Sequence, residues 1–372
     1  MRISLKQTVW ERSSDTLVVV CDPSRQITLH DPDGQAEELL VALSHGPQTL
    51  PELHENLTRR GVRATVDQLQ AALSVFDSLR LLYDVDDDAT PMSPDGGERY
   101  YSNLAFFSAF ATLDVSAAEM QRRLARAHVL QLGTGGLGSN VLQSLAGLGV
   151  GRLTLLDHDI VETRNFARQF LYRESDLGSS KVKRAMAWVQ DYDSRIDVAA
   201  VERKICGPDD IADLLPEVSL VVSGVDQPAA VDQWVNEACV RAGVPWVRGG
   251  MLGTELQYFS VDPGRSPCLA CRDTSYAELL AGDDEDLIGS RLGSRLARLN
   301  RGIGPAAALI GSLVAFEALR YLTGYEPPHA SGAQVRIQIS EGIHPRRQAW
   351  KPDPACVLCD LARKRLEAGS HE

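Results

Sequence analysis

The sequence predicts an α/β protein in which a Rossmann-like domain with a largely parallel sheet follows a smaller α+β domain. Two observations lead to this prediction. An apolar strand, a glycine-rich turn, a helix and a second apolar strand follow one another between His128 and Asp157. Ahead of them, residues 1–88 show short β-patterns followed by helical patterns. The chain of 372 residues is long enough for roughly two or three such domains.

The first 88 residues have the hydrophobic spacing of a small separate domain. Strand patterns cover 3–10, 16–22 and 26–30, and helical patterns cover 35–44, 50–60 and 65–79. Thr49 and Glu52 have the spacing of a capping box at the start of the second helix. Leu81-Leu82-Tyr83 fits a closing strand, so we expect a winged-helix domain at 1–88.

An acidic stretch that runs into turn-forming residues separates the two domains. It contains Asp84, Asp86, Asp87 and Asp88, then Pro91, Pro94, Gly96 and Gly97. This composition predicts a solvated linker. We place the linker and an opening segment at 89–115 and the second domain at 116–372. Within that domain, strands and helices alternate from 128 to 250, which predicts parallel strands, and an apolar helix is expected at 306–322.

The glycine-rich turn has the spacing of a nucleotide-binding loop. It reads Gly133-Thr134-Gly135-Gly136-Leu137-Gly138, and Asp157 ends the next strand about 20 residues later. Glycines let backbone N–H groups approach a phosphate, and the following helix N-terminus favours negative charge. The carboxylate can bind ribose hydroxyls. The glycines alone also fit a nicotinamide-dependent oxidoreductase.

Polar residues after Asp157 distinguish between these two nucleotides. They are Asp159, Asn165, Arg168, Gln169 and Lys181. A nicotinamide site does not need this set, whereas ATP needs its phosphate charge neutralised while one phosphate is attacked. Each residue taken singly fits a solvated helix or loop. The whole set predicts a site for ATP.

The order and spacing of these residues resemble the ubiquitin-activating-enzyme-like superfamily of ThiF/MoeB/HesA adenylating enzymes. The matching motifs are G-x-G-G-L-G at 133–138, L-D-x-D at 156–159, N-x-x-R-Q at 165–169, G-x-x-K at 178–181 and Val225-Asp226. The resemblance covers residues 116–372. It implies an enzyme that activates a carboxylate with ATP and releases pyrophosphate.

The resemblance also implies a role for each motif. The nucleotide-binding set is Gly133, Gly135, Gly136, Gly138, Asp157, Asp159, Asn165, Arg168, Gln169 and Lys181. The catalytic set is Asn165, Arg168, Lys181 and Asp226. We expect Asp226 to hold Mg²⁺, because it follows a predicted parallel strand, where such sheets bind ligands. The alternative for Asp226 is the N-cap of the next helix.

Four of the seven cysteines form two C-x-x-C pairs, Cys268 with Cys271 and Cys356 with Cys359. Two such pairs can converge on one tetrahedral Zn²⁺, and four thiolates leave no open position for catalysis. We therefore expect a structural zinc site, with four reduced structural thiols as the alternative. No cysteine lies between Cys271 and Cys356. A covalent thioester at the place used by thioester-forming relatives is therefore not expected.

The N-terminal domain resembles PqqD-like peptide-recognition elements, in Gly46-Pro47-Gln48-Thr49-Leu50, Leu53 and Leu79-Arg80-Leu81-Leu82-Tyr83. In those elements a leader peptide adds a strand to the sheet edge. The two domains together resemble the maturation enzymes of microcin C and pantocin A. This implies adenylation of a carboxyl group on a ribosomally made precursor peptide.

Other functions stay open at this point. The N-terminal domain also fits a winged helix that binds DNA or mediates dimerisation. The second domain also fits an activator of a ubiquitin-like sulfur-carrier protein, or a noncatalytic scaffold that delivers leader peptides. The net charge of −12 disfavours nonspecific binding to nucleic acid and anionic membranes.

Three further expectations concern location, assembly and a contact between subunits. The apolar runs at 17–21 and 220–222 are too short to span a bilayer, and the N-terminus lacks a secretory signal, so we expect a cytoplasmic protein. The family resemblance implies a homodimer. In the family, an arginine two residues after the pair seen here as Arg99-Tyr100 reaches the neighbouring subunit's ATP, but Ser102 stands there. Arg99, Arg122 and Arg123 are candidates to replace it.

Two segments of the second domain are candidates for substrate contacts. Trp246 to Met251 is expected to follow a strand and border the substrate groove. An acidic run is followed by arginines at helical spacing: Asp283, Asp284, Glu285 and Asp286, then Arg291, Arg295, Arg298 and Arg301. This pattern favours a solvated amphipathic helix, with a site for pyrophosphate or an acidic peptide as the alternative.

Overall fold

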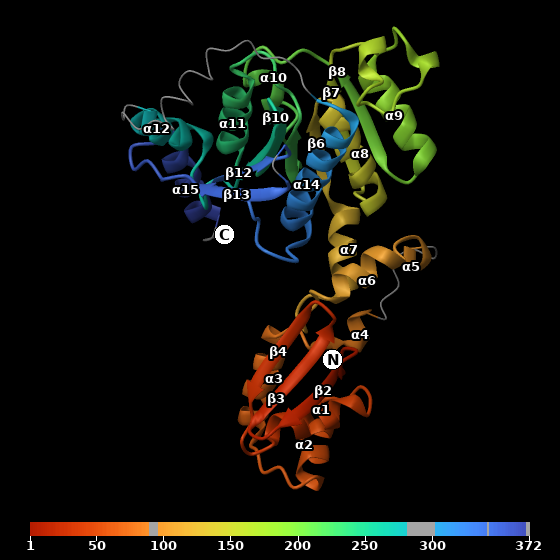
Figure 1. Ribbon diagram of the computed structural model, residues 1–372, viewed down its shortest axis with the longest axis vertical. Coiled ribbons are helices and arrows are strands. Elements are labelled where there is room, and N and C mark those ends of the chain that lie inside the picture. Colours follow the sequence, from red (N-terminus) through yellow and green to blue (C-terminus); the bar gives the residue numbers. More distant parts are fainter. Residues whose placement is uncertain (89–95, 281–301, 341, 370–372) are drawn as a thin grey trace. The chain divides into compact units, whose positions relative to one another are not determined.

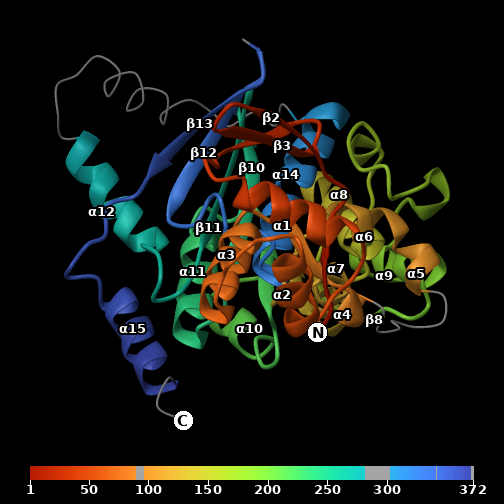
Figure 2. The same cartoon turned by 90° about the horizontal axis from the view of Figure 1, so that it is seen from below.

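The computed structural model describes residues 1–88, 96–280, 302–340 and 342–369 (Figures 1 and 2). The charged helix expected between Asp283 and Arg301 lies outside the described residues. The chain divides into two compact units, Met1–Arg123 and Leu124–Glu372.

The first unit contains a three-stranded antiparallel sheet and three longer helices. The sheet has the order β2 (Val9–Ser13), β3 (Thr16–Asp22) and β4 (Arg25–His30). The helices are α1 (Gln35–Ser44), α2 (Leu50–Arg59) and α3 (Val66–Ser78). β1 (Ile3–Leu5) pairs instead with the closing strand β5 (Leu82–Asp84).

The prediction of one strand over residues 3–10 is wrong. The chain turns between β1 and β2, where the Thr8 hydroxyl donates to the carbonyl of Lys6 at 2.7 Å. β1 and β2 therefore enter different sheets. The closing strand at Leu82 and the helix predicted at 35–44 are confirmed.

Alternation along β3 builds the core of the first unit. Leu17 and Val19 are fully buried on one side of the strand, where Leu40 of α1 and Leu53 of α2 also bury their side chains. The capping box is confirmed, because the backbone N–H and the hydroxyl of Thr49 both donate to Glu52 at 2.8 Å.

Shorter helices complete the first unit. They are α4 (Val85–Asp88), α5 (Gly96–Arg99), α6 (Tyr101–Ser108) and α7 (Ala117–Arg126), the last of which crosses the boundary between the units. Arg122 pairs with Asp87 and Glu119 at 2.9 Å each, and Arg123 contacts Glu119 at 3.4 Å. Both arginines are thus charge-paired within their own unit.

The second unit is organised around an eight-stranded sheet of order β13-β12-β11-β10-β9-β6-β7-β8. Five strands are parallel: β6 (His128–Leu132), β7 (Arg152–Asp157), β8 (Asp197–Glu202), β9 (Leu220–Ser223) and β10 (Trp246–Leu252). Three further strands extend the sheet from β10, each antiparallel to the strand before it: β11 (Glu255–Val261), β12 (Ala333–Gln338) and β13 (His344–Ala349). The predicted α/β fold with a largely parallel sheet is confirmed.

One expectation for this sheet is wrong. Trp246 to Met251 does not follow a strand but forms the strand β10 itself. Its partner β11 pairs along its whole length, from Trp246 opposite Val261 to Leu252 opposite Glu255. The hairpin extends the strand beyond the residues that pair with β9, a contact that local sequence does not reveal.

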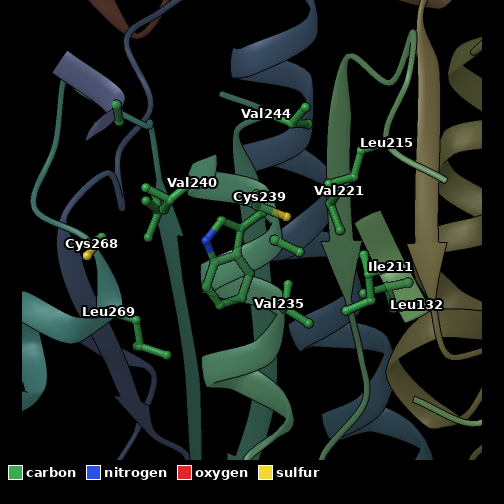
Figure 3. Packing of buried hydrophobic residues seen from close by; sticks show 14 of the residues in the cluster. Leu132, Ile211, Leu215, Val221, Val235, Cys239, Val240, Val244, Cys268 and Leu269 are labelled. Atoms are coloured by element: carbon green, nitrogen blue, oxygen red, sulfur yellow. The ribbon is translucent and has the colours of Figure 1, made fainter. Parts of the chain in front are cut away.

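Helices cover both faces of the sheet. α8 (Gly136–Leu148) and α14 (Gly304–Thr323) lie side by side (Figure 1), and α9 (Lys181–Tyr192) packs on β7 and β8. α10 (Asp209–Ala212) and α11 (Val231–Ala242) belong to a separate core cluster with Leu130 and Leu132 of β6. Figure 3 shows Val235 and Cys239 of α11 beside Val221 of β9.

α14 matches the apolar helix expected at 306–322. By length and composition alone its 20 residues could cross a membrane, but 61% of the apolar window is buried. The helix packs against α8, β10 and β11. It is a core helix of the second unit.

The chain order reverses at the middle of the sheet, and this reversal positions the site. From β6 the chain moves outward to β7 and β8, then returns to β9 on the other side of β6. The loops after β6 and β9 therefore diverge toward opposite faces. Doubly wound sheets bind ligands at such a point, outside the carboxyl ends of the strands.

Candidate functional site

The glycine turn after β6 closes tightly on itself. Gly133 has a φ of +88°, which favours glycine. A Cβ added at Gly138 would lie 2.0 Å from the carbonyl oxygen of Gly133. Both positions therefore require glycine, and the turn brings the start of α8 against the end of β6.

Two residues outside the predicted motifs, Gln131 and Tyr172, brace this turn. Gln131 donates to the carbonyls of Gly133 at 3.1 Å and Gly138 at 2.9 Å. The hydroxyl of Tyr172 donates to the carbonyl of Thr134 at 2.7 Å, and burial raises the pKa of Tyr172, so it stays a neutral donor. The signal for Gln131 was a polar residue inside an apolar strand.

Asp157 connects the end of β7 to the glycine turn. One of its carboxylate oxygens accepts from the backbone N–H of Thr134 at 2.7 Å and from the Thr134 hydroxyl at 2.8 Å. The other accepts from the backbone N–H of Asp159 at 2.9 Å. Asp157 is buried, and its hydrogen bonds to Thr134 fix the conformation of the turn.

Arg168 and Gln169 lie against the turn. A Cβ added at Gly136 would meet Arg168 side-chain carbons at 3.3 Å, and one at Gly135 would meet Gln169 Nε2 at 3.7 Å. The Gln169 side-chain oxygen is buried with no hydrogen-bond partner among the described residues. Such an atom is costly to leave unpaired, which points to a ligand at this position.

Asn165 sets the backbone that presents these two side chains. It is buried at the end of a 3₁₀ turn (Thr163–Asn165), and its side-chain oxygen accepts from the backbone N–H of Glu162 at 2.9 Å. Its own carbonyl accepts from the backbone N–H groups of Arg168 at 3.0 Å and Gln169 at 2.9 Å. A second 3₁₀ turn (Glu174–Asp176) leads toward α9.

Lys181 is a buried cation at the first position of α9. Its ammonium donates to Asp159 Oδ2 at 2.9 Å, and its backbone N–H donates to the Asp159 carbonyl, also at 2.9 Å. Burial raises the pKa of Asp159, but the hydrogen bond and positive charge of Lys181 outweigh burial and lower it overall. Asp159 is therefore the charge partner of Lys181.

Asp226 follows β9 in a loop that touches the glycine turn. A Cβ added at Gly133 would lie 3.1 Å from Val225 and 3.4 Å from Gly224. Asp226 is exposed, and α11 begins only at Val231 with Ala230 as its N-cap. The alternative assignment of Asp226 as that N-cap is wrong. An exposed carboxylate fits the oxygen ligation that Mg²⁺ prefers.

The four cysteines predicted to bind zinc converge at the starts of α12 (Leu269–Leu280) and α15 (Val357–Gly369). The sulfurs of Cys268 and Cys356 are 3.7 Å apart, and those of Cys271 and Cys359 are 3.5 Å apart. Tetrahedral zinc with Zn–S bonds of about 2.3 Å needs sulfurs separated by about 3.8 Å. All four thiols are buried, so the donor set fits a closed structural Zn²⁺ site.

A glycine turn at the reversal point of a doubly wound sheet, with an acid ending the neighbouring strand, is the arrangement of Rossmann-like nucleotide-binding proteins. The family model of the ThiF family matches residues 102–358. This is more than half of the chain, and the chain belongs to the ThiF family.

The related sequences are named as adenylyltransferases. The adenylyltransferase and sulfurtransferase MOCS3 of Mus musculus is 40% identical over 242 residues, covering 64% of this chain and 49% of that protein. The molybdopterin-synthase adenylyltransferase of Escherichia coli K12 is 32% identical over 242 residues, covering 64% of this chain and 89% of that protein. The chain spans about half the length of the mammalian MOCS3 relatives.

Solved structures show the same fold over a larger part of the chain. E. coli MccB has a TM-score of 0.76 and 20% identity, covering 96% of this chain and 97% of MccB. PaaA has a TM-score of 0.62 and 21% identity, covering 76% of this chain and 91% of PaaA. The MccB likeness also extends to residues that precede the ThiF match.

We predict that Gly138→Ala destabilises the second unit by more than about 2 kcal/mol, because the methyl group overlaps the Gly133 carbonyl. Gly147→Ala on the same helix is the control. Its added methyl meets nothing closer than the Tyr192 hydroxyl at 3.6 Å. It should be neutral or stabilise by about 0.5–1 kcal/mol through helix propensity. Urea denaturation measures both; equal effects would contradict the close approach.

We predict that the protein, purified without chelators, contains about one zinc ion per chain, measured by plasma mass spectrometry. Cys359→Ser should lose the metal and lower the melting temperature. Cys206→Ser, at an exposed free cysteine, should change neither. Zinc retained by the Cys359 variant would rule out the four-cysteine site.

Proposed function

We propose that this protein is an ATP-dependent adenylyltransferase that activates a carboxyl group. A carboxylate oxygen of the substrate attacks the α-phosphorus of ATP, and the bond from that phosphorus to the bridging oxygen of the β-phosphate breaks. The products are an acyl adenylate and pyrophosphate. The observation that supports this best is that Arg168 and Gln169 lie against the glycine turn. Asp157, which holds that turn, also accepts a hydrogen bond from Asp159, the charge partner of Lys181.

The residues contribute by orientation and charge rather than by proton transfer. The attacking carboxylate is already ionised and needs no general base, so preorganised donors supply the catalysis. In this proposal the turn at Gly133–Gly138 approaches the phosphates, and the free lone pairs of Asp157 accept from the ribose. Asn165 holds the backbone of Arg168 and Gln169 in place. Mg²⁺ held by Asp226 would neutralise phosphate charge.

The positive charge of Lys181 is neutralised within the protein by Asp159. A buried ammonium without a partner would be unstable, and Asp159 supplies the missing charge. The Asp159 side chain is half exposed, so it can turn toward solvent when phosphate oxygens arrive. We propose that the triphosphate displaces or shares this contact, and that Arg168 shifts along Gly136 to meet it.

We further propose that the substrate is a ribosomally made precursor peptide, bound through its leader by the first unit. The three-stranded sheet has two edge strands, β2 and β4, and an extended peptide can add to such an edge. The structures of E. coli MccB include complexes with MccA and with AMPCPP. The likeness of both units to MccB supports a peptide substrate here.

A second candidate is activation of a ubiquitin-like sulfur-carrier protein. The sequence identity of 32–40% to the molybdopterin-synthase adenylyltransferase and to MOCS3 favours it. It leaves the first unit without a role. A noncatalytic delivery scaffold is less favoured, because Arg168 and Lys181 are present at the motif positions.

We also propose a cytoplasmic homodimer. Four clustered cysteines that hold zinc must stay reduced, and cysteines stay reduced in the cytoplasm. The homodimer follows from family resemblance, with Arg99, Arg122 and Arg123 as candidates for a contact across it.

The test incubates the protein with ATP, Mg²⁺ and precursor peptides encoded beside its gene, and follows AMP by mass spectrometry. AMP should form with a peptide that carries its leader, and at least about tenfold more slowly with the same peptide lacking it. A sulfur-carrier protein ending in Gly-Gly is the comparison substrate. AMP with that protein alone would favour the second candidate, and ADP formation would contradict adenylation.

We predict that Lys181→Ala slows ATP–pyrophosphate exchange by about 10²–10³-fold, because a preorganised cation is lost. Lys183→Ala on the same helix is the matched control. Its side chain is 65% exposed and pairs with Glu202 of β8. It should leave exchange unchanged, and near-normal exchange by the Lys181 variant would contradict the assignment.

A further inference from the structure

A second cation lies at the carboxyl edge of the sheet, apart from the residues of the ATP motifs. Arg248 on β10 is the register partner of Ser223, the last residue of β9. Ser223 is in turn the register partner of Leu132, which directly precedes the glycine turn. Two strand spacings, about 10 Å in all, therefore separate Arg248 from the turn. This is a suitable distance for the acyl part of a substrate beside its nucleotide.

The guanidinium of Arg248 extends toward the ligand-binding edge. A Cβ added at Gly250 would lie 1.9 Å from Arg248 Nη1, so the side chain occupies the space above Gly250. Nη1 donates to the carbonyl of Gly249 at 2.7 Å. β9 ends opposite Arg248, so a group lying over Gly250 is beyond the end of that strand. Only glycine at position 250 leaves room for the guanidinium of Arg248.

The charge of Arg248 is already balanced by the protein. Its Nε lies 3.1 Å from both carboxylate oxygens of Asp232, in the first turn of α11. Both side chains are mostly shielded from solvent, at 17% and 26% exposure. Within the described residues Nη2 makes no hydrogen bond. The pair is neutral overall and still presents unused N–H donors.

Ser223 supplies an independent observation. It is fully buried, and its hydroxyl has no hydrogen-bond partner among the described residues. Register partners in neighbouring strands point to the same face, so the hydroxyl and Arg248 share the face covered by α11. A buried hydroxyl without a partner costs free energy that a bound polar group would recover.

We propose that Arg248 and Ser223 bind a neutral carbonyl oxygen of the acyl substrate, adjoining the carboxyl group that is activated. This inference rests on the proposed adenylation and names a specificity determinant for it. A carboxylate is disfavoured, because it would place a second negative charge beside Asp232. The carbonyl comes from the peptide backbone or from a carboxamide side chain, which share the same acceptor chemistry.

The test measures ATP–pyrophosphate exchange with the polypeptide that supports AMP formation by the unaltered protein. Arg248→Met should raise the KM for that polypeptide about 10- to 100-fold, the loss of one charge-assisted hydrogen bond, while kcat and the KM for ATP change less than about threefold. Ser223→Ala should raise the same KM about 2- to 10-fold. Arg241→Met is the control, since this exposed arginine of α11 pairs with Glu237.

Substrates that differ in the residue adjoining the activated carboxyl distinguish a backbone carbonyl from a carboxamide side chain. With Ala, Asn and Asp at this position, an equal effect of Arg248→Met on Ala and Asn polypeptides indicates a backbone carbonyl. An effect confined to Asn indicates a carboxamide. For the unaltered protein, Asp should be the poorest substrate, and preference for Asp would overturn the proposal.

Asp232→Asn distinguishes substrate binding from a purely structural ion pair. Removing the negative charge leaves Arg248 cationic, so the ratio of kcat/KM for Asp over Asn polypeptides should rise at least about tenfold. A structural role would lower all rates together and leave this ratio unchanged. No exchange by the unaltered protein with any polypeptide would refute adenylation itself. Normal exchange with an unchanged KM in a folded Arg248→Met variant would refute only this inference.

Discussion

The carboxylate of Asp157 holds together the part of the structure on which the proposed chemistry depends. Its hydrogen bonds to Thr134 tie the end of β7 to the turn that ends β6. The glycine turn has few side chains of its own to stabilise it, so its shape must come from outside. Gln131 and Tyr172 supply the remaining contacts. The turn therefore keeps its backbone N–H groups in position before any nucleotide arrives, which is what preorganisation requires.

Lys181 and Arg248, two of the cations at this edge of the sheet, are each paired with a carboxylate. Lys181 is bound to Asp159 on the face of α9, and Arg248 to Asp232 on the face of α11. A buried charge without a partner costs free energy, so each ion pair stabilises the second unit. The two pairs differ in accessibility. Asp159 is half exposed and in the proposed function yields to phosphate, whereas Asp232 is shielded and neutralises Arg248. One pair thus suits an anion, and the other suits a neutral acceptor.

Much of this was readable from local sequence. The glycine spacing, the acid after β7 and the two C-x-x-C pairs are short-range patterns, and each depends on the intrinsic geometry of the backbone or of a metal. Helices such as α1 and α14 were found because their apolar residues recur at the helical period. The strand over residues 3–10 was misjudged, because apolar spacing does not show which sheet a strand joins.

The sequence by itself therefore determined the fold class, the family motifs and the residue types of the site. Only the tertiary structure decided that Asp159 pairs with Lys181, that Asp157 braces Thr134, and that Arg248 lies beside Ser223. The last of these contacts joins strands that follow separate parts of the chain, through a register fixed by β9 and β10. Such contacts depend on sheet order and on which face each side chain points to. Neither is encoded in the spacing of residues along a single segment.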